Sequence, residues 1–364
     1  MLVQVICGRR DAAEAADSLQ ELERLADTAG IEVAGQLTQR RPRPDGATLL
    51  GAGKLADLRA ACEDRGANQV LFDNELNAVQ AYNLTKALER RVFDRTEAIL
   101  QIFARRARSA EAQTQVELAQ LEFLLSRIPV LEAQQRFKGG IGMRGPGESH
   151  LQLRNAPMRR RIADLRKRLA AIQARQRRSR AKRPWPVVSL VGYTNAGKST
   201  LLNALAGADA YVDDRLFATL DTKTRLVRLG EGRQILLTDT VGFIRHLPHG
   251  LVASFRSTLD VACQADLLLV VVDASHPRVQ DHVDVCRATL DEIGAGGVPS
   301  LLVLNKCDLP AAAETATHAA ERHPLAIPVS AHSGLGLDTL RLAVAEELKR
   351  CCTLWQLPSA TSGT

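Results

Sequence analysis

The sequence has no apolar run long enough to cross a bilayer and no cysteine pair with the C-x-x-C spacing typical of metal sites. Its longest apolar stretch, Leu267–Val272, has the length of a β-strand. The first seven residues are too few for a secretory signal, and Arg9 and Arg10 follow them instead of preceding them. The seven cysteines are odd in number and form no C-x-x-C pair, which favours buried free thiols over disulfides or zinc. We therefore expect a cytoplasmic protein without a membrane span, and a monomer.

Internal repeats and low-complexity design are also lacking, and neither the chain before residue 151 nor the chain after residue 186 has a net positive charge. Residues 151–186 hold 13 basic residues and one acid, Asp164, which gives a net charge of +12. Residues 1–150 have a net charge of −1 and residues 187–364 one of −4, so this segment alone makes the chain basic, at +7 overall. Such a concentration indicates an anionic partner, nucleic acid before membrane. The alternative is a solvated helix face.

Residues 1–100 alternate strand and helix, which predicts a small N-terminal α/β domain. We expect strands at Leu2–Cys7, Ile31–Leu37 and Gln69–Asp73, with a helix at Ala12–Ala29. Residues 351–364 form a C-terminal tail without a readable fold.

Residues 101–186 predict a helical hairpin. Two apolar stripes, each with spacings of three, four and three residues, can bury each other. The stripes are Leu118, Leu121, Leu125 and Ile128 in one arm, and Ile162, Leu165, Leu169 and Ile172 in the other. We interpret Pro129 and Pro157 as the ends of the connection, which contains the glycine-rich loop Gly139–Glu148. A loop of this length and composition is expected to be functional or disordered.

Residues 187–350 follow the stiff linker Pro184–Pro186 and open with a phosphate-binding motif. The strand Val187–Val191 precedes GYTNAGKST, and a helix continues at Leu201–Ala206. This is G-x-x-x-x-G-K-[ST] in its strand–loop–helix context, where backbone N–H groups cradle phosphates. We expect Lys198 to reach the β- and γ-phosphates and the Ser199 hydroxyl to bind Mg²⁺. The expected nucleotide contacts in this loop are Gly192, Tyr193, Thr194, Asn195, Ala196, Gly197, Lys198, Ser199 and Thr200.

A second strand, Ile235–Leu237, leads into the sequence DTVGF. We expect Asp239 to bind Mg²⁺ through a water and Gly242 to offer its N–H to the γ-phosphate. Thr219, which lies in the polar segment before that strand, is the candidate switch threonine that closes on Mg²⁺. Thr222 is its rival, and Thr219 could also be an ordinary loop residue.

A third strand, Leu301–Leu304, ends in NKCD, Asn305–Asp308. A carboxylate at Asp308 can accept both N1–H and the 2-amino group of guanine, which adenine cannot satisfy. Ser330 and Ala331 follow the last strand and can support the base. The full set, with Asn305, Lys306 and Asp308, resembles the TRAFAC-class GTPases, which implies a Ras-like doubly wound α/β fold with GTP and Mg²⁺.

Two positions qualify this resemblance. Phe243 stands where Ras-like proteins have the glutamine that orients the attacking water, so intrinsic hydrolysis should be slow. Asn195 resembles the asparagine that helps other GTPases hold K⁺ beside the phosphates, and its alternative role is to shape the loop.

Further segments resemble the HflX family of ribosome-associated GTPases. They are Gly51–Leu58, Val92–Ile128, Gly139–Ser149 and Leu216–Arg225. The resemblance implies an N-terminal α/β domain, a helical hairpin and a GTPase domain that bind the large ribosomal subunit and its rRNA. Members split stalled or idle ribosomes. The basic residues expected to contact RNA are Lys138, Arg144, Arg159, Arg160, Arg161, Arg166, Lys167 and Arg168.

The sequence departs from the family pattern at Asn77–Glu89, at the end of the glycine loop, at Leu151–Pro157 and at Thr222–Lys223. It also stops soon after the GTPase region, where many members continue. These departures favour an alternative, a nucleotide-regulated ribosome-binding or assembly module without splitting activity. A GTPase that acts on tRNA or another RNA is a third possibility. Gly51–Lys54 looks like part of a phosphate loop without its Ser/Thr, and we interpret it as a structural turn rather than a second nucleotide site.

Overall fold

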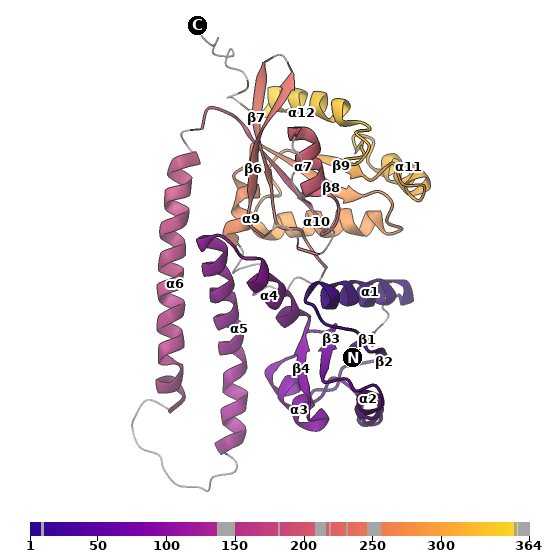
Figure 1. Cartoon of the computed structure of the whole chain (residues 1–364), viewed down its shortest axis with the longest axis vertical. Coiled ribbons are helices and arrows are strands. Elements are labelled where there is room, and N and C mark those ends of the chain that lie inside the picture. Colours follow the sequence, from indigo (N-terminus) through magenta and orange to yellow (C-terminus); the bar gives the residue numbers. More distant parts are fainter. Residues whose placement is uncertain are drawn as a thin grey trace. The chain divides into compact units, whose positions relative to one another are not determined.

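The computed structural model describes residues 1–8, 11–136, 150–180, 183–207, 216–217, 220–230, 232–245, 256–352 and 355 (Figure 1). By its internal packing the chain forms two compact units. The first comprises residues 1–105 and 113–170, and the second residues 106–112 and 171–364. The predicted division into four regions stays a prediction beside this grouping.

The first unit contains a four-stranded parallel sheet in the order β2-β1-β3-β4. Its strands are β1 (Leu2–Cys7), β2 (Gln36–Arg41), β3 (Gln69–Phe72) and β4 (Arg91–Asp94). Its helices are α1 (Ala12–Thr28), α2 (Ala52–Asp64), α3 (Ala78–Leu88) and α4 (Arg95–Arg106). Val3 and Phe72 pack with Leu58 and Leu84 in the core that lies under α2 and α3.

The predicted strand Ile31–Leu37 is wrong, because the second strand is Gln36–Arg41. It pairs in parallel with β1 from Leu2↔Gln36 to Cys7↔Arg41. β2 is an edge strand whose side chains are exposed or half-buried. Its polar sequence therefore carries no apolar alternation that could have located it.

Local hydrogen bonds lie at two helix starts in this unit, and one of them is a side-chain cap. Asn77 and Gln80 form a capping box, in which Gln80 N donates to Asn77 Oδ1 at 2.9 Å and Asn77 N donates to Gln80 Oε1 at 3.1 Å. Gly51, in the segment interpreted as a turn, is the residue before α2, and its N–H donates to Gln39 Oε1 at 3.0 Å. The Gly51–Lys54 segment therefore opens a helix.

The two long helices are α5 (Ala110–Arg136) and α6 (His150–Arg180). Their seam is the apolar cluster of Leu118, Leu121, Leu125, Met158, Ile162, Leu165 and Leu169, as the stripe spacing predicts. Pro129 and Pro157 do not end the helices, since both lie inside them. Proline removes one helical hydrogen bond, and strong helix formers such as Leu and Arg surround these two positions. The loop Gly139–Glu148 lies outside the described residues.

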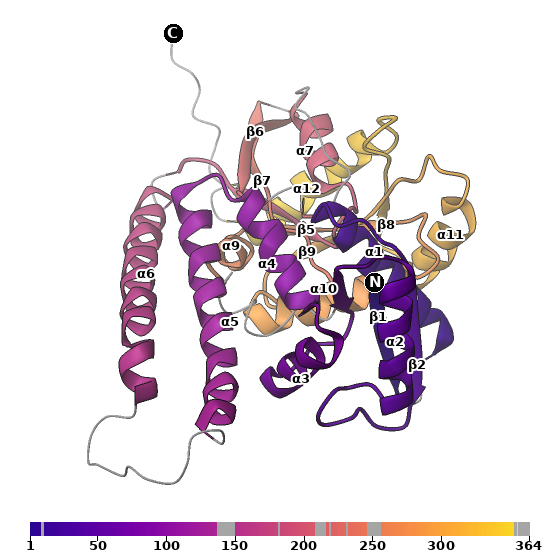
Figure 2. The ribbon, with the colours of Figure 1, turned by 60° about the horizontal axis from the view of Figure 1, so that its bottom comes forward.

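The second unit contains a six-stranded sheet in the order β10-β9-β8-β5-β7-β6, parallel except for the antiparallel pair β6–β7. The ribbons of β5 to β9 can be followed in Figure 2 together with helices α7, α10 and α12. The strands are β5 (Val187–Gly192), β6 (Lys223–Gly230), β7 (Arg233–Asp239), β8 (Leu267–Asp273), β9 (Ser300–Asn305) and β10 (Ile327–Pro328). The helices are α7 (Lys198–Ala206), α9 (Arg256–Cys263), α10 (Val279–Ile293), α11 (Ala312–Arg322) and α12 (Leu337–Cys351).

Apolar layers cover both faces of this sheet, which confirms the predicted doubly wound α/β fold. Leu201 of α7 and Leu340 of α12 belong to one layer, and Val283 of α10 and Ala319 of α11 belong to the other. The run Leu267–Val272 is a fully buried central strand.

The start of the C-terminal tail, whose fold the sequence did not indicate, packs on the second sheet. Helix α12 continues to Cys351, and Cys352 and Trp355 are buried in the core on its side of the sheet. Arg233 Nη1 also donates to the Trp355 carbonyl at 2.6 Å. Within the part of the chain that the structure describes, no helix has both the length and the apolar character needed to cross a membrane.

Candidate nucleotide-binding site

The phosphate loop connects β5 to α7 and holds its lysine inside the fold. Lys198 Nζ donates to the carbonyls of Gly192 at 3.1 Å and Tyr193 at 2.8 Å, and the side chain is buried. Burial lowers the pKa of the Lys198 ammonium, and the negative charge of Asp239 opposes that shift. The loop therefore holds the Lys198 amino group at its centre, in contact with the carbonyl groups around it.

The two glycines of the motif are required by close backbone approach. A Cβ atom on Gly192 would lie 2.0 Å from the Val271 carbonyl oxygen, and one on Gly197 would lie 2.3 Å from Asn305 Nδ2. Both residues have positive φ angles, 146° and 87°. Asn195 also has a positive φ, of 60°, which Asn tolerates better than most residues.

Two oxygen donors meet beside this loop. Ser199, in the first turn of α7, donates its hydroxyl to Asp239 Oδ2 at 2.5 Å, and Asp239 is fully buried at the end of β7. Mg²⁺ prefers hard oxygen ligands such as hydroxyl and carboxylate groups, so this donor set fits the ion. Thr219, the third predicted metal residue, lies outside the described residues.

The segment after β7 lies directly against the phosphate loop. Phe243 N donates to the Gly192 carbonyl at 2.9 Å, and Thr194 N donates to the Phe243 carbonyl at 2.7 Å. A Cβ on Gly242 would lie 2.8 Å from Thr194 Cα and 2.9 Å from Lys198 Nζ, so only glycine fits there. The Phe243 ring is buried in the apolar core, which excludes it from orienting a water molecule at the nucleotide.

Asn305 connects the phosphate loop to the segment that holds Ser330 and Ala331. Its Nδ2 donates to the Ala196 carbonyl at 2.8 Å, and its Oδ1 accepts the Ala331 N–H at 3.0 Å. Both polar atoms of this buried amide thus bind protein groups. The arrangement brings the Asn305 and Ser330–Ala331 segments to the same end of the sheet as Lys198.

Asp308 is exposed at that end and keeps its charge. A hydrogen bond from the Ser330 side chain is the main cause that lowers the pKa of the Asp308 carboxyl, and further hydrogen bonds and nearby cations add to it. Lys306 has a φ of 66°, and its Nζ lies 2.7 Å from Asp273 Oδ2. A charged, accessible carboxylate is the group that can accept two hydrogen bonds from guanine.

Sequence reasoning missed a supporting layer of side chains around the site. Asp273, at the end of β8, pairs with Lys306 and accepts from the Ser275 hydroxyl at 2.6 Å. The Tyr193 hydroxyl accepts the Arg245 N–H at 3.1 Å. Asp273 could have been found by the signal that identified Asp239, a carboxylate directly after a buried strand.

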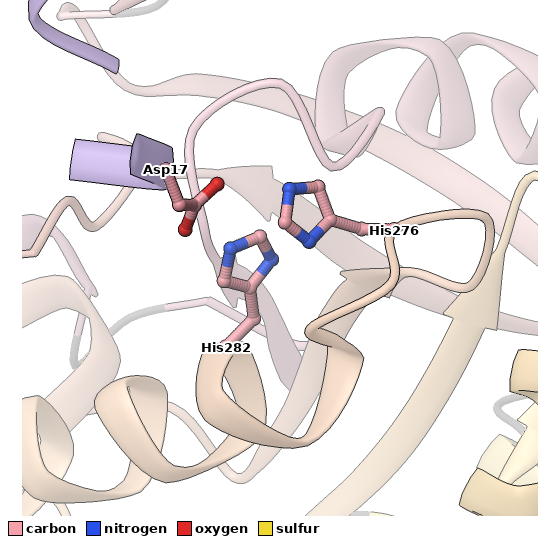
Figure 3. Close-up of side chains that lie close together, drawn as sticks. All are labelled: Asp17, His276 and His282. Atoms are coloured by element: carbon pink, nitrogen blue, oxygen red, sulfur yellow. The ribbon is translucent and has the colours of Figure 1, made fainter. Parts of the chain in front are cut away.

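The Tyr193 ring is also fixed by a stacked histidine. It lies parallel to the His282 ring, with centroids 4.0 Å apart. Figure 3 shows His282 on α10 beside His276 from the preceding loop, with ring centroids 4.3 Å apart. No sequence motif predicted this contact, because it joins the phosphate loop to a helix about 90 residues later in the chain.

The predicted RNA-binding residues form a separate group on α6. Arg161 donates to Glu117 through Nε at 2.7 Å and Nη2 at 2.8 Å, and Arg166 donates to Glu122 at 2.7 Å. Two of the basic side chains are therefore paired with acids of α5, although both remain exposed. The exposed residues Arg159, Arg160, Lys167 and Arg168 complete the described part of the set. Lys138 and Arg144 lie outside the described residues.

Three family models match consecutive parts of the chain. A GTP-binding GTPase N-terminal model matches residues 16–104, and a GTP-binding GTPase middle-region model matches residues 106–183. A model described as 50S ribosome-binding GTPase matches residues 187–306.

Curated relatives extend over nearly the whole chain. It is 46% identical to the GTPase HflX of Caldanaerobacter subterraneus over 352 residues, which cover 96% of this chain and 80% of that protein. It is 44% identical to the GTPase HflX of Escherichia coli, with 91% and 79% covered. Among solved structures, SsGBP in complex with GDP is 25% identical, with a TM-score of 0.50 and coverage of 98% of this chain and 99% of that one.

Proposed function

The chain belongs to the HflX family of GTPases, and from this premise we propose that its GTP-bound form binds the large ribosomal subunit and dissociates stalled or idle ribosomes in the cytoplasm. The observation that supports it best is the guanine-nucleotide site assembled in a chain that also carries an exposed basic helix, α6. The match to a family model described as 50S ribosome-binding GTPase adds support for the ribosomal partner. We take the acting species to be a monomer.

The residues of the site have distinct parts in GTP hydrolysis. Lys198 exchanges its bonds to the loop carbonyls for the β- and γ-phosphate oxygens, and Gly242 offers its N–H to the γ-phosphate. Ser199 and Asp239 are the residues that would hold Mg²⁺, with Thr219 as the switch ligand. Mg²⁺, when bound, neutralises charge that develops on the phosphate oxygens. Asp308 accepts hydrogen bonds from the base, while Asn305 holds the two loops together.

Slow intrinsic hydrolysis follows from the buried Phe243, because no side chain at that position can orient the attacking water. A stimulated rate on the ribosome would then couple hydrolysis to release. Asn195, with its positive φ, is the residue we propose to hold K⁺ beside the phosphates.

Replacement of K⁺ by Na⁺ tests this cation site. We expect hydrolysis to slow by about tenfold, because Na⁺ is too small to hold the same contacts and the cation supplies positive charge in the transition state. The measurement is the single-turnover rate in each salt, for the unmodified chain and for Asn195→Ala. Equal rates in the two salts would remove the K⁺ site.

The attraction to RNA is assigned to the exposed face of α6. Arg159, Arg160, Lys167 and Arg168 lie on it, and Arg161 and Arg166 are partly neutralised by acids of α5. Basic side chains that displace counterions from RNA phosphates give binding that weakens with salt.

Co-sedimentation with purified large subunits tests the proposal. We expect the chain to pellet with the subunits in a non-hydrolysable GTP analogue and to remain in the supernatant in GDP. Equal binding to the large subunits with the GTP analogue and with GDP would overturn the proposal that the nucleotide controls ribosome binding.

The second candidate is a ribosome-binding or assembly module that does not split ribosomes. The altered sequence at Leu151–Pro157 and at the end of the glycine loop favours it. Light scattering of intact ribosomes with the chain and GTP distinguishes the two functions. A fall in scattering supports splitting, and binding without a fall supports the module.

A further inference from the structure

The segment that follows the predicted switch threonine caps the start of helix α5. Asp221 Oδ2 accepts the N–H groups of Arg108 at 3.0 Å and Ser109 at 3.1 Å, and Asp221 Oδ1 accepts the Ser109 hydroxyl. Ser109 Oγ in turn accepts the Ala112 N–H at 3.1 Å. We call these contacts of Asp221 with Arg108 and Ser109 the Asp221 cap. A carboxylate at this position also suits the positive end of the helix dipole.

Helix α5 has residues in both compact units. Residues 106–112 pack with the GTPase unit, whereas residues 113–170 belong to the unit of the N-terminal sheet. Farther along α5, Arg127 Nη2 donates to Asp94 Oδ2 at 2.7 Å, at the end of β4. Leu118 lies in the seam with α6. The first residues of α5, which follow the Asp221 cap, therefore belong to the nucleotide-binding unit.

Asp221 lies close in sequence to the residues expected to bind the metal. Asp221 comes two positions after Thr219 and two before Lys223, whose register partner in the β6–β7 pair is Asp239. Asp239 contacts Ser199 at 2.5 Å. In GTPases of this kind the γ-phosphate changes the position of switch segments, so the backbone that carries Asp221 is the backbone on which a bound nucleotide acts.

We propose that Asp221 is a positioning residue that couples the nucleotide state to the first turn of α5. A change of nucleotide alters the Asp221 cap, and the altered cap changes how the start of α5 is held. Such coupling is reciprocal. If the nucleotide changes the stability of the cap by some factor, loss of the cap must change the ratio of GTP affinity to GDP affinity by that factor. This inference rests on the proposed GTPase site and uses no contact with the ribosome. A negative result for the coupling therefore leaves the proposal of ribosome binding untouched, and the reverse also holds.

Hydrogen exchange on the free full-length chain tests the coupling. In the unmodified chain we expect deuterium uptake at the amides of residues 108–112 to differ by about threefold or more between GDP and a non-hydrolysable GTP analogue. In Asp221→Ala we expect this difference to vanish, and in Ser109→Ala, which loses the hydroxyl contact but keeps the two N–H donors, we expect it to shrink. We also expect the ratio of the two nucleotide affinities to change by about fivefold, a typical allosteric coupling. Asp221→Glu, which keeps the carboxylate, should restore part of both effects.

The exposed acid Glu346 on α12 provides a matched control, and Glu346→Ala should leave uptake and affinities unchanged. The proposal is overturned if the unmodified chain shows equal uptake in both nucleotides, or if Asp221→Ala and Ser109→Ala keep the full difference. A loss of GDP and GTP affinity by the same factor in Asp221→Ala would also overturn it, since that result assigns Asp221 to nucleotide binding alone. Should Asp221→Ala fail to fold, Ser109→Ala on the helix side decides the same question.

Discussion

At the scale of single residues, Asn305 and Asp308 of the same short motif have different surroundings. Asn305 is buried and uses both ends of its amide to join Ala196 to Ala331, whereas Asp308 is exposed and charged. The sequence placed both residues among the nucleotide contacts. Their different parts could not be predicted, because the partners of Asn305 lie 109 and 26 residues away along the chain.

Asp308→Asn should change the base that the site accepts. The amide presents N–H donors where the carboxylate accepts hydrogen bonds from guanine, and xanthine offers an oxygen at the matching position. We expect GTP affinity to fall by about 10- to 100-fold and affinity for the xanthine nucleotide to rise, as measured by competition with a fluorescent nucleotide. Asp338→Asn, at an exposed position of α12, is the control. Unchanged GTP affinity in Asp308→Asn would refute the guanine assignment.

Gly242→Ala should impair hydrolysis more than nucleotide binding. The new methyl group would lie 2.8 Å from Thr194 Cα and 2.9 Å from Lys198 Nζ, so the segment after β7 must shift away from the γ-phosphate position. We expect the single-turnover rate to fall by about tenfold or more, with GDP affinity changed by less than about threefold. Gly297→Ala is the control because a Cβ there meets open space. Equal rates for the Gly242→Ala chain and the control would contradict this reading of Gly242.

At the scale of elements, the apolar pattern predicted which helix faces pack together, but the sequence did not predict where helices and strands end. The stripes at Leu118 and Leu165 pack together in the seam of α5 and α6. The helix ends predicted at Pro129 and Pro157 were wrong, because a long helix can lose one hydrogen bond and continue. The edge strand β2 was misplaced because its side chains are largely exposed and its pairing depends on backbone hydrogen bonds.

Leu165→Ala tests the seam between α5 and α6. Leu165 is 1% exposed, and its truncation leaves a cavity between the helices. We expect the free energy of unfolding to fall by about 2–5 kcal/mol in a denaturant titration. Leu124→Ala, at a position of α5 that is 50% exposed, should change it by less than about 0.5 kcal/mol. Equal effects of the two substitutions would show that the seam contributes no specific stability.

At the scale of the whole molecule, the positive charge of the chain has a definite place. The +12 segment extends over most of α6, and part of it is neutralised by Glu117 and Glu122. The pairing could not be predicted from the sequence, because it depends on the register between two helices. The doubly wound fold was predicted correctly because strand–loop–helix motifs are local, whereas the Asp221 cap joins residues more than 110 positions apart.

Removal of charge from α6 should change how RNA binding depends on salt. With Arg159, Arg160 and Arg168 all replaced by Gln, we expect weaker binding to large subunits. The slope of log affinity against log salt should also be shallower, by about one for each RNA phosphate that the variant no longer neutralises. The matched control replaces the exposed arginines Arg225, Arg228 and Arg322 of the GTPase unit by Gln. A slope that is the same for both triple variants and the unmodified chain would show that α6 is only a solvated face.

The most direct test of the central claim combines the base switch with ribosome binding. The measurement is the affinity of the Asp308→Asn chain for purified large subunits in non-hydrolysable analogues of GTP and of the xanthine nucleotide. We predict tight binding with the xanthine analogue and weak binding with the GTP analogue, the reverse of the unmodified chain. Binding of the Asp308→Asn chain that is equally tight with either analogue, or without nucleotide, would contradict the claim that this site controls association with the ribosome.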